Sequence, residues 1–126
     1  GSKFALQGIS ETLSAELKPF NIAVTAVQPG SFRTDWAGRS MVRSPRSISD
    51  YDQSFGPIRE TREKRSGHQP GDPRKAARAL LTLVNMPEPP EFLLLGSDAV
   101  RLVRDKISRM QTSLNEMESL SQSTDG

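Results

Sequence analysis

The chain has 126 residues, a net charge of +2 and no cysteine. Its length suits one domain or part of one, and the small positive surplus argues against a basic nucleic-acid-binding protein. The lack of cysteine excludes disulfides, thiol nucleophiles and thiolate metal sites, and it suits a reducing compartment. We therefore expect a cytoplasmic protein, and no apolar run approaches the roughly 18 residues that a membrane span needs.

The first predicted element is an amphipathic helix over residues 3–18. Its apolar side chains recur at about every fourth position from Ala5 to Leu17. Gly8 interrupts the helix at a cost of about 1 kcal/mol relative to alanine, so we expect another segment to pack closely there. Pro19 ends the helix.

A β-strand is predicted over residues 21–27. This run is rich in β-branched side chains and is apolar on both faces. Such a composition is typical of a strand that is buried on both sides of a parallel sheet. Pro29 and Gly30 stop the strand.

Residues 37–71 are predicted to form a lid. Aliphatic side chains are sparse there, glycine and proline punctuate the segment, and so long an excursion inside a domain is usually functional or mobile. A short helix is expected near residues 58–65. Acidic side chains such as Asp50, Asp52 and Glu60 lie among the arginines, so we favour a solvated helical face over a nucleic-acid patch.

A second helix is predicted to start at Asp72, a good N-cap, with Pro73 in the first helical position, and to end before Pro87. A short strand over residues 91–95 follows, and Gly96 closes it. The helix is expected to bury one apolar face, formed by Ala76, Ala77, Leu80, Leu81 and Val84.

The last predicted element is a long helix that Ser97 and Asp98 cap. Basic side chains near its start and acidic ones near its end oppose the helix dipole. We therefore expect fraying beyond Leu114 and a polar, disordered tail over residues 119–126. Packing or a subunit interface would use its apolar stripe, which steps by three and four residues: Val100, Val103, Ile107, Met110, Leu114 and Met117.

Helices and strands alternate along the chain, which favours a parallel α/β sheet with helices on its faces. Two strands do not make a stable sheet alone, so the chain either pairs with other strands or lacks most of its sheet. The sequence opens Gly1-Ser2-Lys3 without a methionine, and we expect a fragment.

Two short motifs in order carry a family resemblance. Ser2-Lys3-Phe4-Ala5-Leu6 starts a helix, and the following strand ends in Pro29-Gly30-Ser31-Phe32-Arg33-Thr34. This arrangement resembles the C-terminal half of a short-chain dehydrogenase/reductase, beginning at the lysine of Tyr-x-x-x-Lys and continuing to Pro-Gly-x-x-x-Thr. The resemblance covers roughly residues 1–36 and 70–96.

The resemblance implies a fold, an activity and partners. Residues 1–118 would be the C-terminal part of a Rossmann-like doubly wound parallel sheet with a mobile lid and a long C-terminal helix. The parent would transfer hydride between NAD or NADP and a small carbonyl or alcohol substrate, as a homodimer or homotetramer with the first helix as an interface. The family's tyrosine, serine and Gly-rich loop would lie upstream, so we expect this chain to be inactive alone.

In the family, the residue that corresponds to Lys3 tunes the tyrosine four residues before it and hydrogen-bonds the nicotinamide ribose. Residues four apart share a helix face. At about 4 Å and an effective dielectric near 20, an ammonium attracts a phenolate by roughly 4 kcal/mol and lowers the phenol pKa toward the range useful for proton transfer. The alternative is a solvated lysine.

The resemblance places Pro29 and Gly30 beside the cofactor, and it sets the backbone of Phe32 and the hydroxyl of Thr34 against the nicotinamide carboxamide. Glycine lets a backbone approach a ligand closely, and ligands of open α/β sheets bind beyond the carboxyl ends of the strands. The alternative is an ordinary turn after a strand.

Three lid side chains, Trp36, Met41 and Tyr51, either line the substrate mouth together with Phe32 or pack the lid onto its own domain. His68 is the only histidine, so we expect neither a metal site nor a Ser-His-Asp arrangement. The alternative to an enzyme segment is a truncated, non-catalytic interaction or vestigial module derived from such an enzyme.

Overall fold

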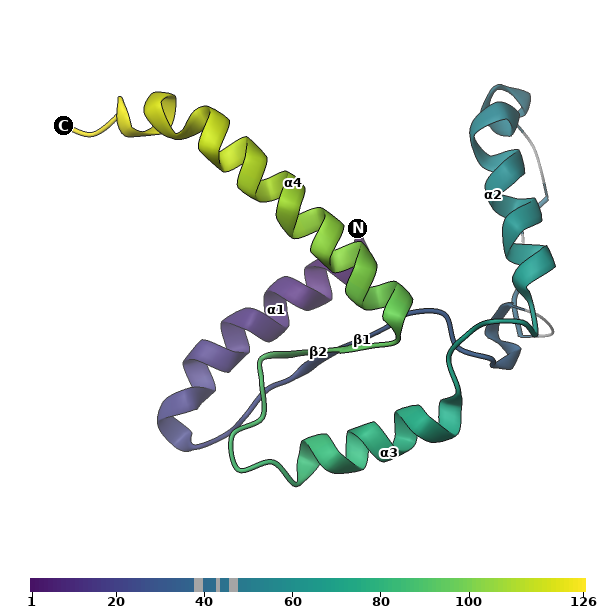
Figure 1. The fold of residues 1–126 in the computed structure, drawn as a ribbon, viewed down its shortest axis with the longest axis horizontal. Coiled ribbons are helices and arrows are strands. Elements are labelled where there is room, and N and C mark those ends of the chain that lie inside the picture. Colours follow the sequence, from purple (N-terminus) through teal and green to yellow (C-terminus); the bar gives the residue numbers. More distant parts are fainter. Residues whose placement is uncertain (38–39, 43, 46–47) are drawn as a thin grey trace.

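The computed structural model describes residues 1–37, 40–42, 44–45 and 48–126. It confirms an α/β fold with a small parallel sheet and a long C-terminal helix (Figure 1). Parts of the predicted lid, including Arg39, Arg43 and Arg46, lie outside the described residues. In chain order the elements are α1 (Ser2–Leu17), η1 (Lys18–Phe20), β1 (Ala26–Pro29), η2 (Asp35–Ala37), η3 (Ser49–Tyr51), α2 (Asp52–Arg65), α3 (Pro73–Val84), β2 (Phe92–Leu95) and α4 (Ser97–Gln122).

The two strands β1 and β2 run parallel, with Ala26 opposite Phe92 and Pro29 opposite Leu95. The prediction of a strand over residues 21–27 was therefore wrong in both bounds, because pairing starts only at Ala26 and continues to Pro29. The reason is the length of the partner: β2 has four residues, so it offers no ladder to residues 22–25. Upstream of the ladder, the Thr25 hydroxyl donates to the Pro90 carbonyl at 2.6 Å.

Helix α1 lies along β1 and ends at Leu17, before Pro19 as predicted. The Gln28 side-chain amide in β1 donates to the Gln7 side chain in α1, which ties the helix to the strand. A methyl group at Gly8 would meet no atom within 4 Å in the described residues. The expectation of a close neighbour at Gly8 is therefore not met by any described segment.

Helix α3 begins as its sequence predicts. The Asp72 carboxylate accepts a hydrogen bond from the Arg74 backbone N–H at 2.8 Å, and Pro73 takes the first helical position. The predicted apolar face was partly wrong, because the buried residue is Leu83, whereas Leu81 and Val84 are exposed. In the view of Figure 1, α1 and α3 lie on opposite sides of the two strands.

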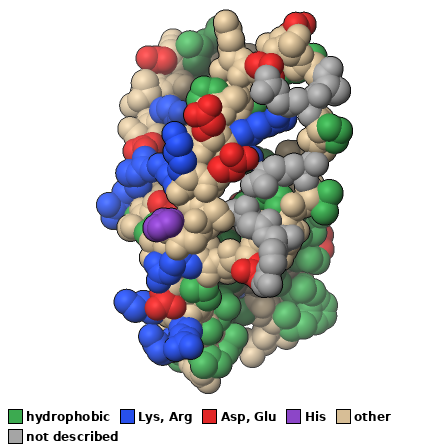
Figure 2. All heavy atoms as spheres, turned by 90° about the vertical axis from the view of Figure 1, so that its right-hand side faces the viewer, with side chains coloured by type: hydrophobic (Ala, Val, Ile, Leu, Met, Phe, Trp, Pro, Cys, Tyr) green, Lys and Arg blue, Asp and Glu red, His purple; other side chains and the backbone are tan. Residues whose placement is uncertain are grey.

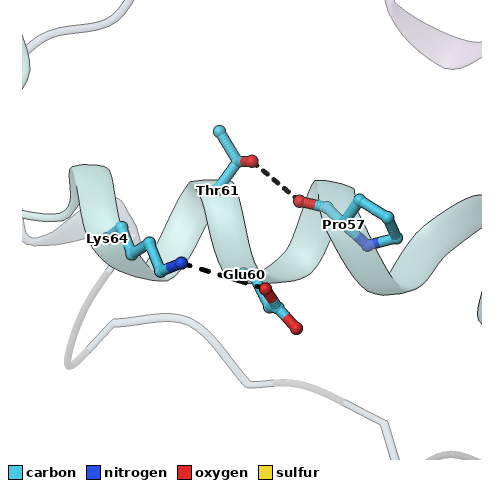
Figure 3. A network of polar contacts seen from close by, with 4 residues as sticks. All are labelled: Pro57, Glu60, Thr61 and Lys64. Carbon is cyan, nitrogen blue, oxygen red and sulfur yellow. Dashed lines mark hydrogen bonds and ion pairs between the residues drawn. The ribbon is translucent and has the colours of Figure 1, made fainter.

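Helix α2 lies in the predicted lid and stands apart from the sheet (Figure 1). Basic and acidic side chains are interspersed on the face of the molecule shown in Figure 2. The helix is longer than the expected segment near residues 58–65 and passes through Pro57. The Thr61 hydroxyl donates to the Pro57 carbonyl at 2.7 Å, and Lys64 lies 3.9 Å from Glu60, one turn apart (Figure 3).

Helix α4 begins at Ser97 and continues to Gln122. Residues 119–122 are thus helical where the sequence predicts a disordered tail. Side-chain hydrogen bonds one turn apart accompany this extension, such as the one that Gln122 donates to Glu118. The predicted cap was wrong in detail: Gly96 occupies the N-cap position, and no side-chain hydrogen bond caps the helix there.

The buried core of the described residues is small. Its apolar members are Leu83, Leu95 and Ala99, which come from α3, β2 and α4. Large apolar side chains on α1, α3 and α4 remain exposed. Among the described residues, no helix is both long and apolar enough to cross a membrane.

Candidate functional site

The carboxyl ends of β1 and β2 meet at one edge of the sheet. The Gly30 backbone N–H donates to the Leu95 carbonyl at 2.8 Å, so the pairing continues one residue past β1. The chain leaves the sheet after each strand, at Gly30 after β1 and at Gly96 after β2. The φ of Gly96 is +101°. In parallel α/β sheets this edge is where ligands bind.

A carboxylate lies between these two glycines. Asp98 accepts hydrogen bonds from the Ser31 backbone N–H at 2.7 Å and from the Ala99 backbone N–H at 3.0 Å. A Cβ atom added to Gly30 would lie 2.1 Å from one Asp98 carboxylate oxygen, and one added to Gly96 would lie 2.7 Å from it. Only glycine fits this approach of backbone to carboxylate at both positions.

Hydrogen bonding from the Ser31 backbone N–H, the largest cause, holds the pKa of Asp98 below its usual value, and this effect outweighs desolvation. The sequence predicted Asp98 only as part of a helix cap, and its link to Ser31 was not predicted. The available signal was the pair of glycines, Gly30 and Gly96, that follow two strands expected to be parallel neighbours.

Phe32 forms an isolated parallel bridge with Gly71, the residue that precedes the cap of α3. The bridge uses the Gly71 N–H, which donates to the Ser31 carbonyl, and the Gly71 carbonyl, which accepts from the Arg33 N–H, both at 3.0 Å. A Cβ atom on Gly71 would lie 2.6 Å from the Phe32 ring, so the ring covers this glycine. The Arg33 guanidinium adds a 2.7 Å hydrogen bond to the Gln69 carbonyl.

The bridge leaves the Phe32 main chain available. Within the described residues, neither its N–H nor its carbonyl is used in a hydrogen bond. The ring, in contrast, is half-buried between the positions of Gly71 and Gly96. Phe32 therefore presents one donor and one acceptor from a fixed stretch of backbone at the carboxyl edge of the sheet.

Thr34 follows this loop and opens η2. Its hydroxyl oxygen accepts a long, 3.4 Å hydrogen bond from the Trp36 backbone N–H. The hydroxyl proton has no acceptor among the described residues, and Thr34 is exposed.

Lys3 lies in the first turn of α1 and is exposed. It is four residues before Gln7, so it shares the helix face that meets Gln28 of β1. Gln28 precedes Pro29, the last residue of the strand. Lys3 therefore lies on the same face of α1 as Gln7. This face contacts β1, the strand that ends at Pro29.

The three lid residues Trp36, Met41 and Tyr51 differ in their surroundings. Tyr51 stacks edge-on against Phe55, with ring centroids 6.1 Å apart, and both line a shallow hollow of the lid. Trp36 is 67% exposed on η2, whereas Met41 is half-buried. Tyr51 thus contacts another aromatic side chain of the predicted lid. No group of three metal-ligating side chains occurs in the described part of the chain.

These features define an α/β protein with parallel strands, in which glycines border the carboxyl edge of the sheet. Residues 1–43 match the sequence model of the short chain dehydrogenases. The chain is 40% identical over 105 residues to an uncharacterized oxidoreductase of Schizosaccharomyces pombe, covering 82% of this chain and 35% of that protein. It is 38% identical over 93 residues to 3-ketodihydrosphingosine reductase of Bacteroides thetaiotaomicron, covering 71% of this chain and 33% of that protein.

The structure is also similar to the crystal structure of a short-chain dehydrogenase from Streptomyces avermitilis, with a TM-score of 0.81 and 35% sequence identity. That similarity covers 98% of this chain and 44% of the other. The chain belongs to the short-chain dehydrogenase/reductase family. It spans about a third of the length of the curated relatives it matches.

Proposed function

We propose that this chain supplies the nicotinamide side of the active site of an NAD(P)-dependent oxidoreductase that interconverts a carbonyl and an alcohol. The observation that carries the proposal is the main chain of Phe32 at the carboxyl edge of the sheet, whose N–H and carbonyl make no hydrogen bond within the described part of the chain. One N–H and one carbonyl complement a primary carboxamide, which has one acceptor oxygen and an NH₂ donor. The nicotinamide of NAD or NADP carries such a group and supplies the hydride chemistry when bound.

The surroundings of Phe32 keep this donor and acceptor in place. The bridge to Gly71 and the hydrogen bond from Arg33 to Gln69 anchor the loop on one side. On the other side, Asp98 anchors Ser31. A loop held on both sides loses little further conformational freedom when a ligand binds.

Thr34 and Lys3 take supporting roles in this proposal. The Thr34 hydroxyl donates a hydrogen bond to the cofactor next to the carboxamide site. The Lys3 ammonium, on the face of α1 that meets β1, hydrogen-bonds the ribose and favours the phenolate of a tyrosine four residues before it, which transfers the proton. Pro29 and Gly30 border the nicotinamide, and Trp36, Met41 and Tyr51 belong to the lid over the substrate.

We further propose that the 126 residues are inactive alone and act within a longer cytoplasmic, homo-oligomeric protein. The small core supports this, because only three apolar residues of the described chain are buried. Phosphate binding at a Gly-rich loop and helix N-terminus, as the family resemblance implies, would come from upstream residues.

A threonine variant pair tests the proposal in the native protein. Thr34→Val removes the hydroxyl and keeps the shape, whereas Thr34→Ser keeps the hydroxyl. We expect Thr34→Val to raise the KM for the cofactor about tenfold, the equivalent of one hydrogen bond of about 1.4 kcal/mol, and Thr34→Ser to change it little. Equal KM values for both variants would contradict the role of Thr34.

Direct cofactor binding tests the proposal as a whole. Titration calorimetry of the native protein with NADH and NADPH is expected to show saturable binding of one of them, while this chain alone shows none at micromolar concentration. A native protein that binds neither would overturn the proposal and favour the non-catalytic module.

A further inference from the structure

The second half of α4 has an apolar stripe that nothing in the described chain covers. The first turns of the helix pack on the sheet, with Ala99 buried and Val103 half-buried. Beyond them the helix extends past the rest of the molecule (Figure 1). The members of the stripe are Ile107 at 58%, Met110 at 61%, Leu114 at 61% and Met117 at 52% exposure, and Leu120 beside it is 69% exposed.

The stripe has the spacing of a coiled coil. Steps of three and four residues from Ile107 to Met117 repeat the a and d positions of a heptad. Ile107, Met110 and Leu114 border a shallow groove along the helix. A seam of this kind is completed by another helix that inserts its own side chains.

The charges of α4 are segregated along its length. Residues 97–109 carry four basic and two acidic side chains, whereas residues 110–122 carry Glu116 and Glu118 and no basic side chain. This order opposes the dipole of an isolated helix. An antiparallel neighbour of the same sequence reverses the balance, because its acidic half then lies beside the basic half of the first helix.

We propose that α4 pairs antiparallel with α4 of a second copy of this chain. The two-fold axis passes near Thr112. In this register Ile107 packs against Met117 of the partner subunit, and Met110 packs against Leu114 of the partner subunit. By symmetry these contacts occur twice, which gives four apolar layers over about 15 Å of helix.

The flanking charges select this register. At the edge of the seam, Arg104 lies opposite Glu118 of the partner subunit, again twice. If the register of the pair shifted by one heptad toward the start of α4, the seam would have to include Val103. Val103 is half-buried against its own chain. A slip the other way would lose Ile107 from the seam. A parallel pair would place the two basic halves side by side.

The seam is short, so the association is expected to be weak and concentration-dependent. Two heptads of an isolated helix are marginal in water, but here the start of α4 is anchored. Ala99 is buried, and Lys106 lies 4.4 Å from the centroid of the Phe4 ring in α1. The helix is therefore already ordered when the second copy arrives.

Charge reversal tests the proposal by sedimentation equilibrium of the chain. We expect Arg104→Glu and Glu118→Arg each to weaken dimerisation at least about fivefold, since each creates two like-charge pairs. The double variant restores the affinity to within about twofold. Glu116→Arg makes the same charge change away from the seam and leaves the affinity unchanged. A monomer at all concentrations, or association that ignores these reversals, would overturn the proposal.

Cross-linking tests the orientation, because the chain has no cysteine of its own. Ser113→Cys lies beside its own copy across the two-fold axis and is expected to cross-link with a short bismaleimide. Ser119→Cys faces away from the seam and is expected not to react in this way. Ile107→Cys forms a disulfide with its copy only in a parallel pair, so an Ile107→Cys dimer would contradict the antiparallel arrangement.

Discussion

The Asp98 carboxylate accepts a hydrogen bond from the Ser31 backbone N–H at 2.7 Å. This single contact joins the turn after β1 to the first turn of α4, which follows β2. The two residues are 67 positions apart in sequence, so the contact fixes the carboxyl edge of the sheet from both strands. The loop that carries Phe32 begins at this contact.

Removal of the carboxylate is expected to loosen this edge. Asp98→Ala should lower the free energy of unfolding by about 1 kcal/mol, because two backbone N–H groups lose their acceptor while water partly replaces it. Equilibrium urea denaturation measures the change. Asp105→Ala is the matched control: Asp105 forms an exposed ion pair with Arg101 at 3.6 Å, so its removal should change stability little.

Acid should destabilise the protein through Asp98 and Asp72. Hydrogen bonds from Ser31 and from Arg74, respectively, hold the pKa of each carboxyl below its usual value. A group with a lowered folded pKa stabilises the fold above its unfolded pKa of about 3.9 and loses this contribution as pH falls through the folded pKa. Stability should therefore be level from about pH 7 to pH 5 and fall below about pH 4. Asp98→Asn should reduce that fall in stability. An Asp98→Asn variant that loses as much stability below pH 4 as the unaltered protein would contradict this role of Asp98.

Gly30→Ala should be more harmful than an ordinary glycine substitution. Its Cβ would lie 2.1 Å from an Asp98 carboxylate oxygen, so Asp98 must leave its hydrogen bond to Ser31. We expect a loss of about 1–3 kcal/mol. Gly56→Ala in α2, where a Cβ meets nothing within 4 Å, should instead stabilise the helix by up to about 1 kcal/mol. Thermal unfolding measures both variants. Unfolding temperatures that shift in the same direction would contradict the close approach of Gly30 to Asp98.

Gly71→Ala should destabilise the protein, and a smaller side chain at position 32 should restore only part of the lost stability. The added Cβ would lie 2.6 Å from the Phe32 ring and 2.7 Å from the Ser31 carbonyl oxygen. Phe32→Ala removes the first clash and leaves the second. A double-mutant cycle should therefore give a coupling of about 0.5–2 kcal/mol that falls short of full rescue. Strictly additive effects would show that the ring does not cover Gly71.

Local signals in the sequence predicted some elements well. The start of α3 at Pro73 follows from Asp72 and Pro73 themselves, because capping needs only neighbouring residues. The bounds of β1 could not be predicted in this way, since Phe92 and Leu95, far along the chain, decide which residues pair. Likewise, the buried position of Leu83 depends on what packs against α3.

The candidate site was predicted to a similar degree. Pro29 and Gly30 were predicted to stop the strand together, but Pro29 still pairs with Leu95 and the chain leaves the sheet only at Gly30. The link from Asp98 to Ser31 and the bridge from Phe32 to Gly71 were not predicted, because each joins segments that are far apart in the sequence. Such contacts leave no periodic pattern in the sequence.

The central claim, that this chain is the nicotinamide side of a hydride-transferring enzyme, is tested most directly by the length and sequence of the native protein in its source. The account predicts a chain at least twice as long, consistent with the 35% and 44% of its relatives that these residues span. It predicts a tyrosine four residues before Lys3 and a Gly-rich loop further upstream. A native protein of these 126 residues alone, with no tyrosine for Lys3 to act on, would contradict it.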